Sequence, residues 1–238
     1  MPYDDQSVDK KTQVTNMFDK IAPYYDFLNR LLTLGIDQRW RRKAILVLKD
    51  HPNEHILDLA TGTADMPIMM HKLLNPTKIT GIDISKNMIE IGQKKIANRK
   101  LEDQIELKLG DSERIDFESG TFDAATASFG VRNFGDLKLG LSEMHRVLKN
   151  QGKIVILEFS KPTIFPIKQL FNIYFKYILP QVGKLTSKDP KAYQYLYESV
   201  QAFPDYENFA EVMKSCGFKN VSWKALTMGI CTIYTGEK

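Results

Sequence analysis

Cysteine is scarce in this chain of 238 residues, which contains only Cys216 and Cys231. Two cysteines do not provide the disulfide framework that stabilises small secreted domains. The first residues are polar and acidic, unlike the basic and apolar regions of a secretory signal peptide. The expected location is therefore a reducing cytoplasm.

Long apolar runs, clustered histidines and a large charge excess are also lacking. No apolar run approaches the ~18 residues of a membrane-spanning helix. A net charge of +4 is small for a nucleic-acid-binding protein, so we expect no nucleic-acid partner. The same charge would not repel an anionic membrane, and peripheral contact with its inner face stays open. The histidines show no ligand spacing and predict no metal site: His51, His55, His71 and His145.

Short apolar segments alternate with amphipathic ones through the middle of the chain. Ser85 and Asp136 are the expected N-caps of two helices. This alternation is typical of a doubly wound α/β sheet. The pattern predicts strands at about 55–60, 78–83, 105–109, 124–128 and 153–159, and helices at 65–74 and 86–99.

The N-terminal region has apolar side chains at helical spacing over residues 12–48. Pro23 and Gly35 interrupt this spacing, so we expect two or three helices rather than one. We interpret residues 1–48 as a helical lid. The length of the chain suits one sizeable core, and a single domain over 1–238 is expected.

The C-terminal region changes pattern after the last strand of the alternation. Residues 160–218 predict a helical cover on the same domain, and 219–225 and 228–235 predict two closing strands. Residues 164–179 are rich in aromatic side chains and contain only two lysines. They predict either a helix that touches a membrane or binds a prenyl chain, or a buried packing or homodimer helix.

Acidic residues stand at the ends of three successive predicted strands. Asp58 precedes the first loop, Asp83 ends the second strand and Asp111 follows the third. Because parallel strands bind ligands at their carboxyl ends, these side chains are candidates for one site. The alternative for any single aspartate is a helix cap or a solvated loop residue.

The first loop indicates which ligand this site accepts. A dinucleotide loop needs G-x-G-x-x-G so that pyrophosphate can approach a helix N-terminus, whereas this loop has only Gly62. S-adenosylmethionine contains adenosine but no phosphate. Asp83 could accept its ribose hydroxyls and Asp111 its adenine amine. Asp58 could face the cationic end of the ligand or brace the loop by accepting backbone N–H bonds.

Several strings resemble the ubiquinone/menaquinone biosynthesis C-methyltransferases over essentially the whole chain: residues 17–26, 128–133, 157–162 and 198–204. The resemblance implies a class I S-adenosylmethionine-dependent fold, with a Rossmann-like seven-stranded sheet whose last strand is antiparallel. It also implies the cofactor S-adenosylmethionine and the C-methylation of a polyprenyl quinol. Demethylmenaquinol is the first expectation, and a benzoquinol precursor of ubiquinone or another small molecule is the alternative. A non-enzymatic protein that keeps only the fold is a further alternative.

Cofactor contacts implied by the resemblance are Thr63, Asp83, Asp111, Ser112 and Ser128. Gly62, Asp83 and Asp111 follow from the chemistry as well, whereas Thr63 and Ser128 rest on the resemblance alone. One departure concerns Ala64, where the family usually has glycine. Alanine permits close approach of a ligand but does not easily adopt a positive φ.

Arg132 is the candidate catalytic residue of the implied reaction. Its guanidinium could stabilise a quinol phenolate, while water or Glu158 accepts the proton. The alternative for Arg132 is a salt bridge that braces its loop. Tyr25 and Asn133 are candidate substrate contacts, with helix packing and a turn as the respective alternatives.

Overall fold

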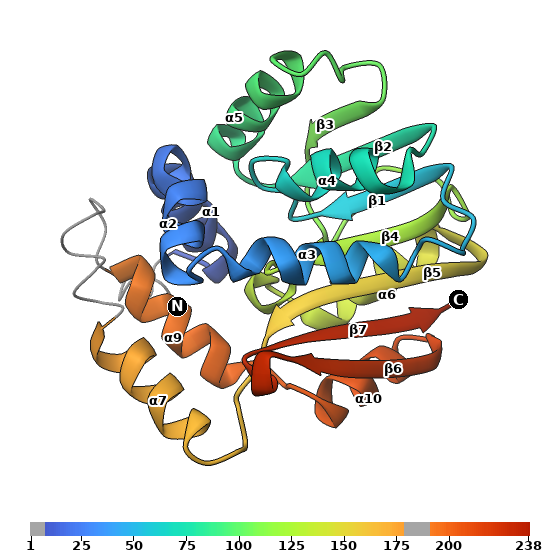
Figure 1. Cartoon of the computed structure of the whole chain (residues 1–238). Coiled ribbons are helices and arrows are strands. Elements are labelled where there is room, and N and C mark those ends of the chain that lie inside the picture. The colour runs from blue at the N-terminus through green and yellow to red at the C-terminus, as the bar shows by residue number, and fades with distance from the viewer. Residues whose placement is uncertain (1–7, 179–190) are drawn as a thin grey trace.

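Seven strands form one mixed sheet in the computed structural model, which describes residues 8–178 and 191–238 (Figure 1). Their order is β3-β2-β1-β4-β5-β7-β6, and β7 runs antiparallel to both of its neighbours. The predicted sheet with an antiparallel last strand is therefore confirmed. The strands are β1 His55–Leu59, β2 Lys78–Asp83, β3 Ile105–Leu109, β4 Phe122–Ser128, β5 Leu148–Phe159, β6 Lys219–Leu226 and β7 Cys231–Glu237.

Helices cover both faces of the sheet, because side chains alternate between the faces along each strand. Ile56 packs toward α3, α4 and α5, whereas its neighbour Leu57 packs toward α6 and α10. The main helices are α1 Lys10–Ile21, α2 Tyr25–Leu32, α3 Ile36–Leu46, α4 Asp65–Leu74, α5 Lys86–Ala97, α6 Leu137–Val147, α7 Ile167–Ile173, α9 Lys191–Ala202 and α10 Glu207–Ser215. Short turns are η1 Ala22–Tyr24, η2 Val131–Asn133, η3 Tyr174–Ile178 and η4 Thr227–Gly229.

The predicted helix starts are confirmed. Ser85 accepts a hydrogen bond from the backbone N–H of Met88, and Asp136 accepts one from Leu139. The predicted breaks in the N-terminal region are also present, because Pro23 lies in η1 and Gly35 adopts φ 74° between α2 and α3.

The strand boundaries near β4 and β5 differ from the prediction. Both strands begin earlier than predicted, because Phe122 pairs with Leu148 across a register shift. Ala64 also departs from expectation, since it adopts φ 66° at the start of α4. Its methyl group is fully buried, so packing holds a left-handed conformation that costs alanine about 1 kcal/mol.

The N-terminal helices lie over the carboxyl ends of β1, β2 and β3, and we keep the name lid for them as an interpretation. Asp19 of α1 accepts a hydrogen bond from the Ser85 hydroxyl, and Asp26 of α2 accepts one from Thr63. The single domain over 1–238 stays a prediction, because 1–7 and 179–190 lie outside the described residues. None of the described helices is long and apolar enough to cross a membrane.

Candidate active site

Two cavities meet where the lid covers the strand ends. The first, here called the strand-end cavity, has about 70 Å³ and is lined by the residues that follow β1, β2 and β3 together with α1 and α2. The second, the apolar cavity, has about 390 Å³ and lies between the lid, α7, η3 and α9. Four residues line both cavities: Phe18, Tyr25, Phe129 and Asn133.

Asp83 joins the first loop to α5 at the strand-end cavity. One carboxylate oxygen accepts the N–H of Gly62 at 2.8 Å, and the other accepts the N–H of Ser85 at 2.8 Å. Burial raises the pKa of Asp83 to about 6, although both backbone bonds favour the charged form. Each oxygen keeps a second lone pair, so the carboxylate can accept ligand hydroxyls from the cavity.

Asp111 and Ser112 also line the strand-end cavity, and their contact with a cofactor stays a prediction. The ammonium of Lys11 on α1 lies 2.7 Å from Asp111 and 2.8 Å from Glu113. Glu113 also accepts the N–H of Gly135 at 2.7 Å. Sequence reasoning missed Lys11 and Glu113, because their roles depend on a contact between residues about 100 positions apart.

Asp58 lies beneath the first loop and is buried. It accepts hydrogen bonds from the hydroxyls of Thr126 at 2.6 Å and Thr61 at 2.7 Å. The carboxylate therefore braces the loop through side-chain hydroxyls, not through the backbone N–H groups that the sequence suggested. Burial raises its pKa to about 6 against these two bonds.

Thr63 and Ser128 are not in the strand-end cavity. Both line a third, small cavity beneath the first loop, together with Asp58, Tyr25 and Arg41. The Thr63 hydroxyl donates to Asp26 of α2, and the Ser128 hydroxyl accepts from Arg41 at 2.7 Å. Tyr25 lines all three cavities and is the wall that they share.

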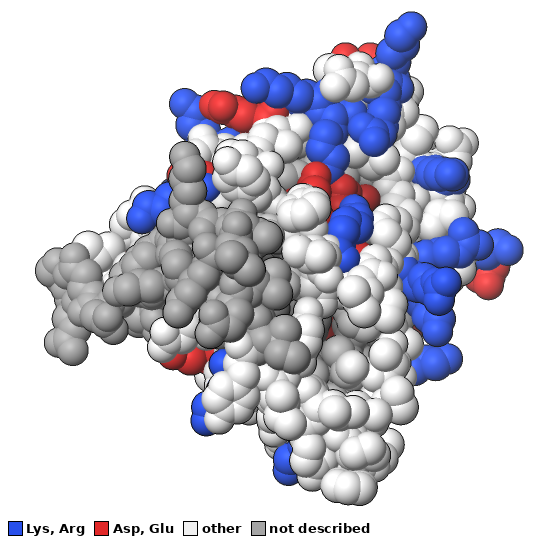
Figure 2. Space-filling model, turned by 60° about the vertical axis from the view of Figure 1, so that its left-hand side comes forward, with Lys and Arg blue, Asp and Glu red and all other residues white. Residues whose placement is uncertain are grey.

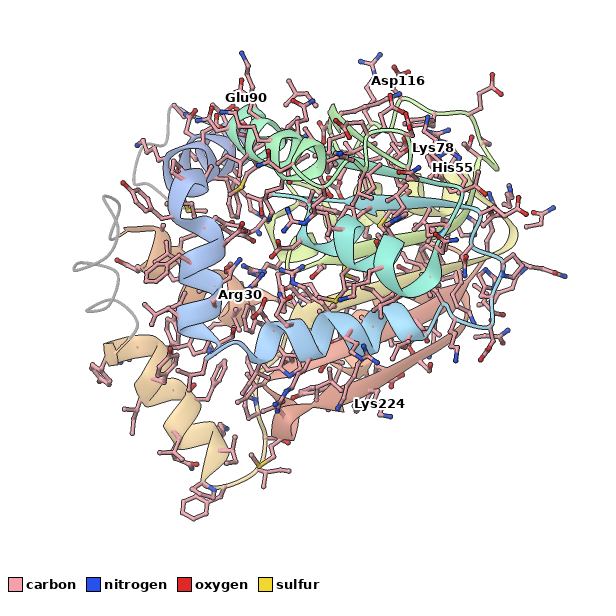
Figure 3. All side chains as sticks on the ribbon, turned by 45° about the horizontal axis from the view of Figure 1, so that its top comes forward. Arg30, His55, Lys78, Glu90, Asp116 and Lys224 are labelled. Atoms are coloured by element: carbon pink, nitrogen blue, oxygen red, sulfur yellow. The ribbon has the colours of Figure 1, made fainter. Side chains whose placement is uncertain are left out.

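A charged network holds α2 against this loop. The ammonium of Lys95 on α5 contacts Asp26 and Asp65, and Asp65 also pairs with Arg30. Arg30 lies where α2 meets α3 and pairs with Asp37 there (Figure 3). Nearby Lys95 and Arg41 lower the pKa of Asp65 to about 2 despite its burial. The lid is therefore tied to the first loop by ion pairs as well as by packing.

Arg132 lies on η2 after β4, where it contacts both a buried carboxylate and the apolar cavity. Its Nη1 donates to Glu158 at 2.7 Å and to the carbonyl of Phe129 at 2.6 Å, so the predicted bracing salt bridge is present. Glu158 is fully buried and lines neither the strand-end cavity, nor the apolar cavity, nor the small cavity. Arg132 also lines the apolar cavity, where its buried Nε has no hydrogen-bond partner.

Asn133 has a buried Oδ1 without a partner at the junction of the two cavities. The walls of the apolar cavity are aromatic and aliphatic. The ring centroids of Phe171 and Phe175 are 4.2 Å apart, and those of Phe129 and Phe159 are 4.7 Å apart. The apolar cavity can therefore hold a hydrophobic ring whose polar group meets Arg132 and Asn133.

The predicted aromatic segment, residues 164–179, contributes some side chains to the wall of the apolar cavity and others to the protein surface. Its last residue, Leu179, lies outside the described residues. Phe171 and Phe175 are buried against the apolar cavity, whereas Phe165 is 76% exposed and Tyr177 is 61% exposed. The packing interpretation therefore holds for one side of this segment, and the other side is open to contact.

Trp40 lines the apolar cavity and Arg41 lines the small cavity, although sequence reasoning singled out neither residue. A signal was available, because Asp37 and Arg41 fall on the buried stripe of α3 together with Ala44 and Ile45. Charged residues on a buried stripe are unusual and point to a partner or a ligand.

Comparison with known proteins identifies relatives of the whole chain. The model of the ubiE/COQ5 methyltransferase family matches residues 6–238. A demethylmenaquinone methyltransferase of Bacteroides fragilis is 48% identical, and the match covers 96% of this chain and 94% of the relative. A ubiquinone/menaquinone biosynthesis C-methyltransferase of Geotalea daltonii is 46% identical, with coverage of 97% and 98%.

Solved structures that resemble this chain support the fold alone. A Thermotoga maritima S-adenosylmethionine-dependent methyltransferase, described as a possible histamine N-methyltransferase, has a TM-score of 0.66 at 16% identity and covers 94% of this chain and 99% of that chain. The [4+2]-cyclase SpnF has a TM-score of 0.68 at 16% identity, with 97% of each chain covered. Because a cyclase shares this architecture, the chemistry of the site rests on its side chains.

Proposed function

Because the chain belongs to the ubiE/COQ5 methyltransferase family, we propose that it transfers a methyl group from S-adenosylmethionine to a ring carbon of a demethylated polyprenyl quinol. Its acceptor is demethylmenaquinol, which becomes menaquinol in menaquinone biosynthesis. The observation that carries the proposal is the junction of the two cavities at Tyr25, Phe129 and Asn133. A polar adenosine site there adjoins an apolar cavity that suits a quinol.

The strand-end cavity fits S-adenosylmethionine better than a dinucleotide. Asp83 presents carboxylate lone pairs for ribose hydroxyls, and Asp111 presents them for the adenine amine. Asp65 stands in the first turn of α4, where its carboxylate would oppose a pyrophosphate. When bound, S-adenosylmethionine supplies an electrophilic methyl group on its sulfonium.

Arg132 makes the acceptor carbon nucleophilic. A quinol ring carbon attacks well only after the adjacent hydroxyl loses its proton, and a guanidinium N–H stabilises the resulting phenolate. Glu158 holds this guanidinium in place and lines neither of the two cavities, so the hydroxyl proton passes to water. After the methyl group has moved from sulfur to the ring carbon, the hydrogen on that carbon leaves as a proton to water and the phenolate oxygen is protonated again, so that one proton is released overall. Asn133 orients the quinol through its unpaired Oδ1, and the aromatic walls exclude bulk water.

The role of Arg132 is tested with a variant that keeps the buried ion pair. Alanine at this position would leave Glu158 charged, buried and unpaired, and the protein would lose stability. Arg132→Lys keeps the charge beside Glu158 but loses the planar fork of donors. We expect kcat to fall by about 10²-fold while the affinity for S-adenosylhomocysteine changes less than about twofold. An unchanged kcat would exclude the catalytic role.

The activity itself is tested with labelled S-adenosylmethionine and two short-chain acceptors, a demethylmenaquinol and a demethyl benzoquinol. We expect label in the naphthoquinol product and a higher kcat/KM for the naphthoquinol. A preference for the benzoquinol would indicate a role in ubiquinone biosynthesis instead. Relatives of this chain are named for the menaquinone pathway alone or for both the ubiquinone and the menaquinone pathways. Absence of transfer to either acceptor by a protein that binds S-adenosylhomocysteine would overturn the proposal.

Some of the apolar side chains that line the apolar cavity are exposed to solvent and form a rim around it. Leu34, Leu170 and Met228 line the cavity and are 83%, 58% and 57% exposed. Phe165 and Ile173 add exposed apolar surface beside α7. Figure 2 shows the lower part of this face mostly white, with lysines or arginines at its margin. Residues 161–178 contain three lysines and no acidic residue.

This rim docks on an anionic membrane, in which a polyprenyl quinol resides. Lysines attract the lipid headgroups and apolar side chains enter the interface. The test is co-sedimentation with vesicles of phosphatidylglycerol and phosphatidylethanolamine. Phe171 and Phe175 are unsuitable for substitution in this test because both are buried. Phe165→Asp should reduce binding by about tenfold, whereas Leu139→Asp on exposed α6 should not.

Two results would contradict membrane docking. One is a wild-type protein that does not bind these vesicles. The other is a homodimer in sedimentation velocity that Phe165→Asp converts to a monomer, since the rim would then be covered by a second copy of the chain.

A further inference from the structure

The strand-end residues are arranged in the order of the parts of the proposed cofactor. Asp111 follows β3, Asp83 ends β2 and Gly62 follows β1, and these strands are neighbours in that order. If adenine lies at Asp111 and ribose at Asp83, the chain of atoms beyond the ribose passes the first loop toward β4. Ser128 ends β4, and its hydroxyl is held by Arg41. The amino-acid end of the cofactor is therefore directed toward Arg41.

Arg41 is buried with most of its donors unused. It is 5% exposed and lies on α3 against the ring of Phe129, whose centroid is 5.2 Å from the guanidinium carbon. A guanidinium has five N–H donors. Among the described residues, the only hydrogen bond from Arg41 is that of Nη1 to Ser128, and its buried Nε has no partner. Burying a guanidinium whose N–H donors lack acceptors destabilises the folded protein unless a ligand supplies those acceptors.

The neighbouring acid does not account for Arg41. Asp37 already accepts hydrogen bonds from Arg30, Gln38 and Thr33. Its nearest oxygen is 3.6 Å from Nε of Arg41, outside hydrogen-bond geometry. The ion pair with Asp37 orients the guanidinium, but it leaves Nε without a hydrogen bond in a residue that lines the small cavity.

The small cavity has a lining of both charges. Its lining includes Arg41 together with the carboxylates of Asp58 and Asp65. Such a lining suits a zwitterion better than a simple anion, because an ammonium and a carboxylate each find an opposite charge. An α-amino acid group is a zwitterion of this kind. The remaining volume of about 10 Å³ holds about one water, so the cavity must widen for this group to enter.

We infer that Arg41 binds the α-carboxylate of the methionyl part of S-adenosylmethionine, with Ser128 holding the guanidinium in position. This inference rests on the proposed function only for the identity of the cofactor. It makes Arg41 a cofactor-specificity residue, because a carboxylate is what distinguishes S-adenosylmethionine from its decarboxylated form.

The test compares two ligands that differ only in this carboxylate. Calorimetry without any quinol measures the affinities for S-adenosylmethionine and for decarboxylated S-adenosylmethionine. We expect the wild-type protein to prefer the carboxylated ligand by about 30-fold or more. Arg41→Gln should lose this preference and keep the affinity for the decarboxylated ligand within about threefold. Arg42→Gln, on the exposed side of the same helix, is the matched control and should keep the preference.

Three results separate the possibilities. If Arg41→Gln weakens both ligands equally, Arg41 only supports the fold and the inference is overturned. An unchanged preference in Arg41→Gln also overturns it. If the wild-type protein shows the preference and Arg41→Gln loses it, but the wild-type protein methylates no quinol, the inference stands and the proposed function fails.

Discussion

Asp83 shows at the residue scale how one carboxylate can serve both the fold and a ligand. It joins Gly62 to Ser85 and also faces the strand-end cavity. Its pKa of about 6 lies near the pH at which the enzyme would work. Protonation removes an acceptor for ribose hydroxyls, so cofactor affinity depends on this group.

We therefore predict that the affinity for S-adenosylhomocysteine falls as the pH decreases through about 6. The fraction of charged Asp83 drops about tenfold between about pH 7 and pH 5, and the affinity should drop in proportion. Titration calorimetry at several pH values measures this change. Asp83→Asn should bind more weakly at neutral pH and show a flat profile, and a flat profile in the wild-type protein would disprove the coupling.

Asp58 gives a second prediction, which concerns stability. Burial raises its pKa in the folded state to about 6, above the unfolded value of 3.8. The folded state therefore holds a proton that the unfolded state has released, and stability contributed by this group is lost as the pH rises from about 4 to about 6. Asp58→Asn avoids this loss.

The free energies of unfolding of Asp58→Asn and of wild type, measured with urea, should thus differ at about pH 8 and agree more closely at about pH 4. At the higher pH we expect the free energy of unfolding of Asp58→Asn to exceed that of wild type by on the order of 1 to 3 kcal/mol. A variant less stable than wild type at about pH 8 would show that the charged form is favoured by its hydroxyl partners.

The loops after β1 and β4 illustrate the element scale, because the site requires them to touch. A Cβ atom at Gly130 would lie 2.4 Å from the Cβ of Ala60. Ala60 itself adopts φ 51°, a conformation that glycine accepts without strain. The close approach brings Gly62 of the first loop and Ser128 at the end of β4 to the same small cavity.

Gly130→Ala should therefore separate the two loops, lower the free energy of unfolding by about 1 to 3 kcal/mol and weaken cofactor binding. Ala60→Gly in the same chain removes the methyl group that causes the overlap. We expect this double variant to recover most of the stability and affinity in thermal unfolding and calorimetry. A double variant as unstable as Gly130→Ala would show that the loops do not meet in this way.

At the scale of the whole molecule, the proposed function requires two entrances, one at the strand ends for the cofactor and one at the apolar rim beside α7 for the acceptor. The two routes end at the shared walls Tyr25, Phe129 and Asn133. Delivery of a membrane-embedded quinol should therefore depend on the rim, whereas the chemistry should not.

We predict that Phe165→Asp lowers the kcat/KM for a long-chain quinol embedded in vesicles by about tenfold, as the loss of an apolar contact of about 1.4 kcal/mol would require. Its kcat/KM for a short-chain quinol in solution should match that of wild type. Leu139→Asp is the control for an added surface charge. Equal losses with both acceptors would indicate damage to the apolar cavity instead of impaired membrane delivery.

Local sequence determined the elements of this protein and part of its site. The bounds of α4, β2 and β3 agree with the prediction, because apolar periodicity and the Ser85 cap depend on residues a few positions apart. The sequence also indicated that Asp83 and Asp111 lie near one cavity, since parallel strands bring their carboxyl ends to one edge of the sheet.

Tertiary structure alone decided how the charged residues are paired and which remain unpaired. Lys11 meets Asp111 and Arg41 meets Ser128 across 100 and 87 positions of chain. Burial gives Asp58 its raised pKa and leaves Nε of Arg41 without a partner. These properties depend on desolvation by residues that the strand order brings together, and no local pattern encodes that environment.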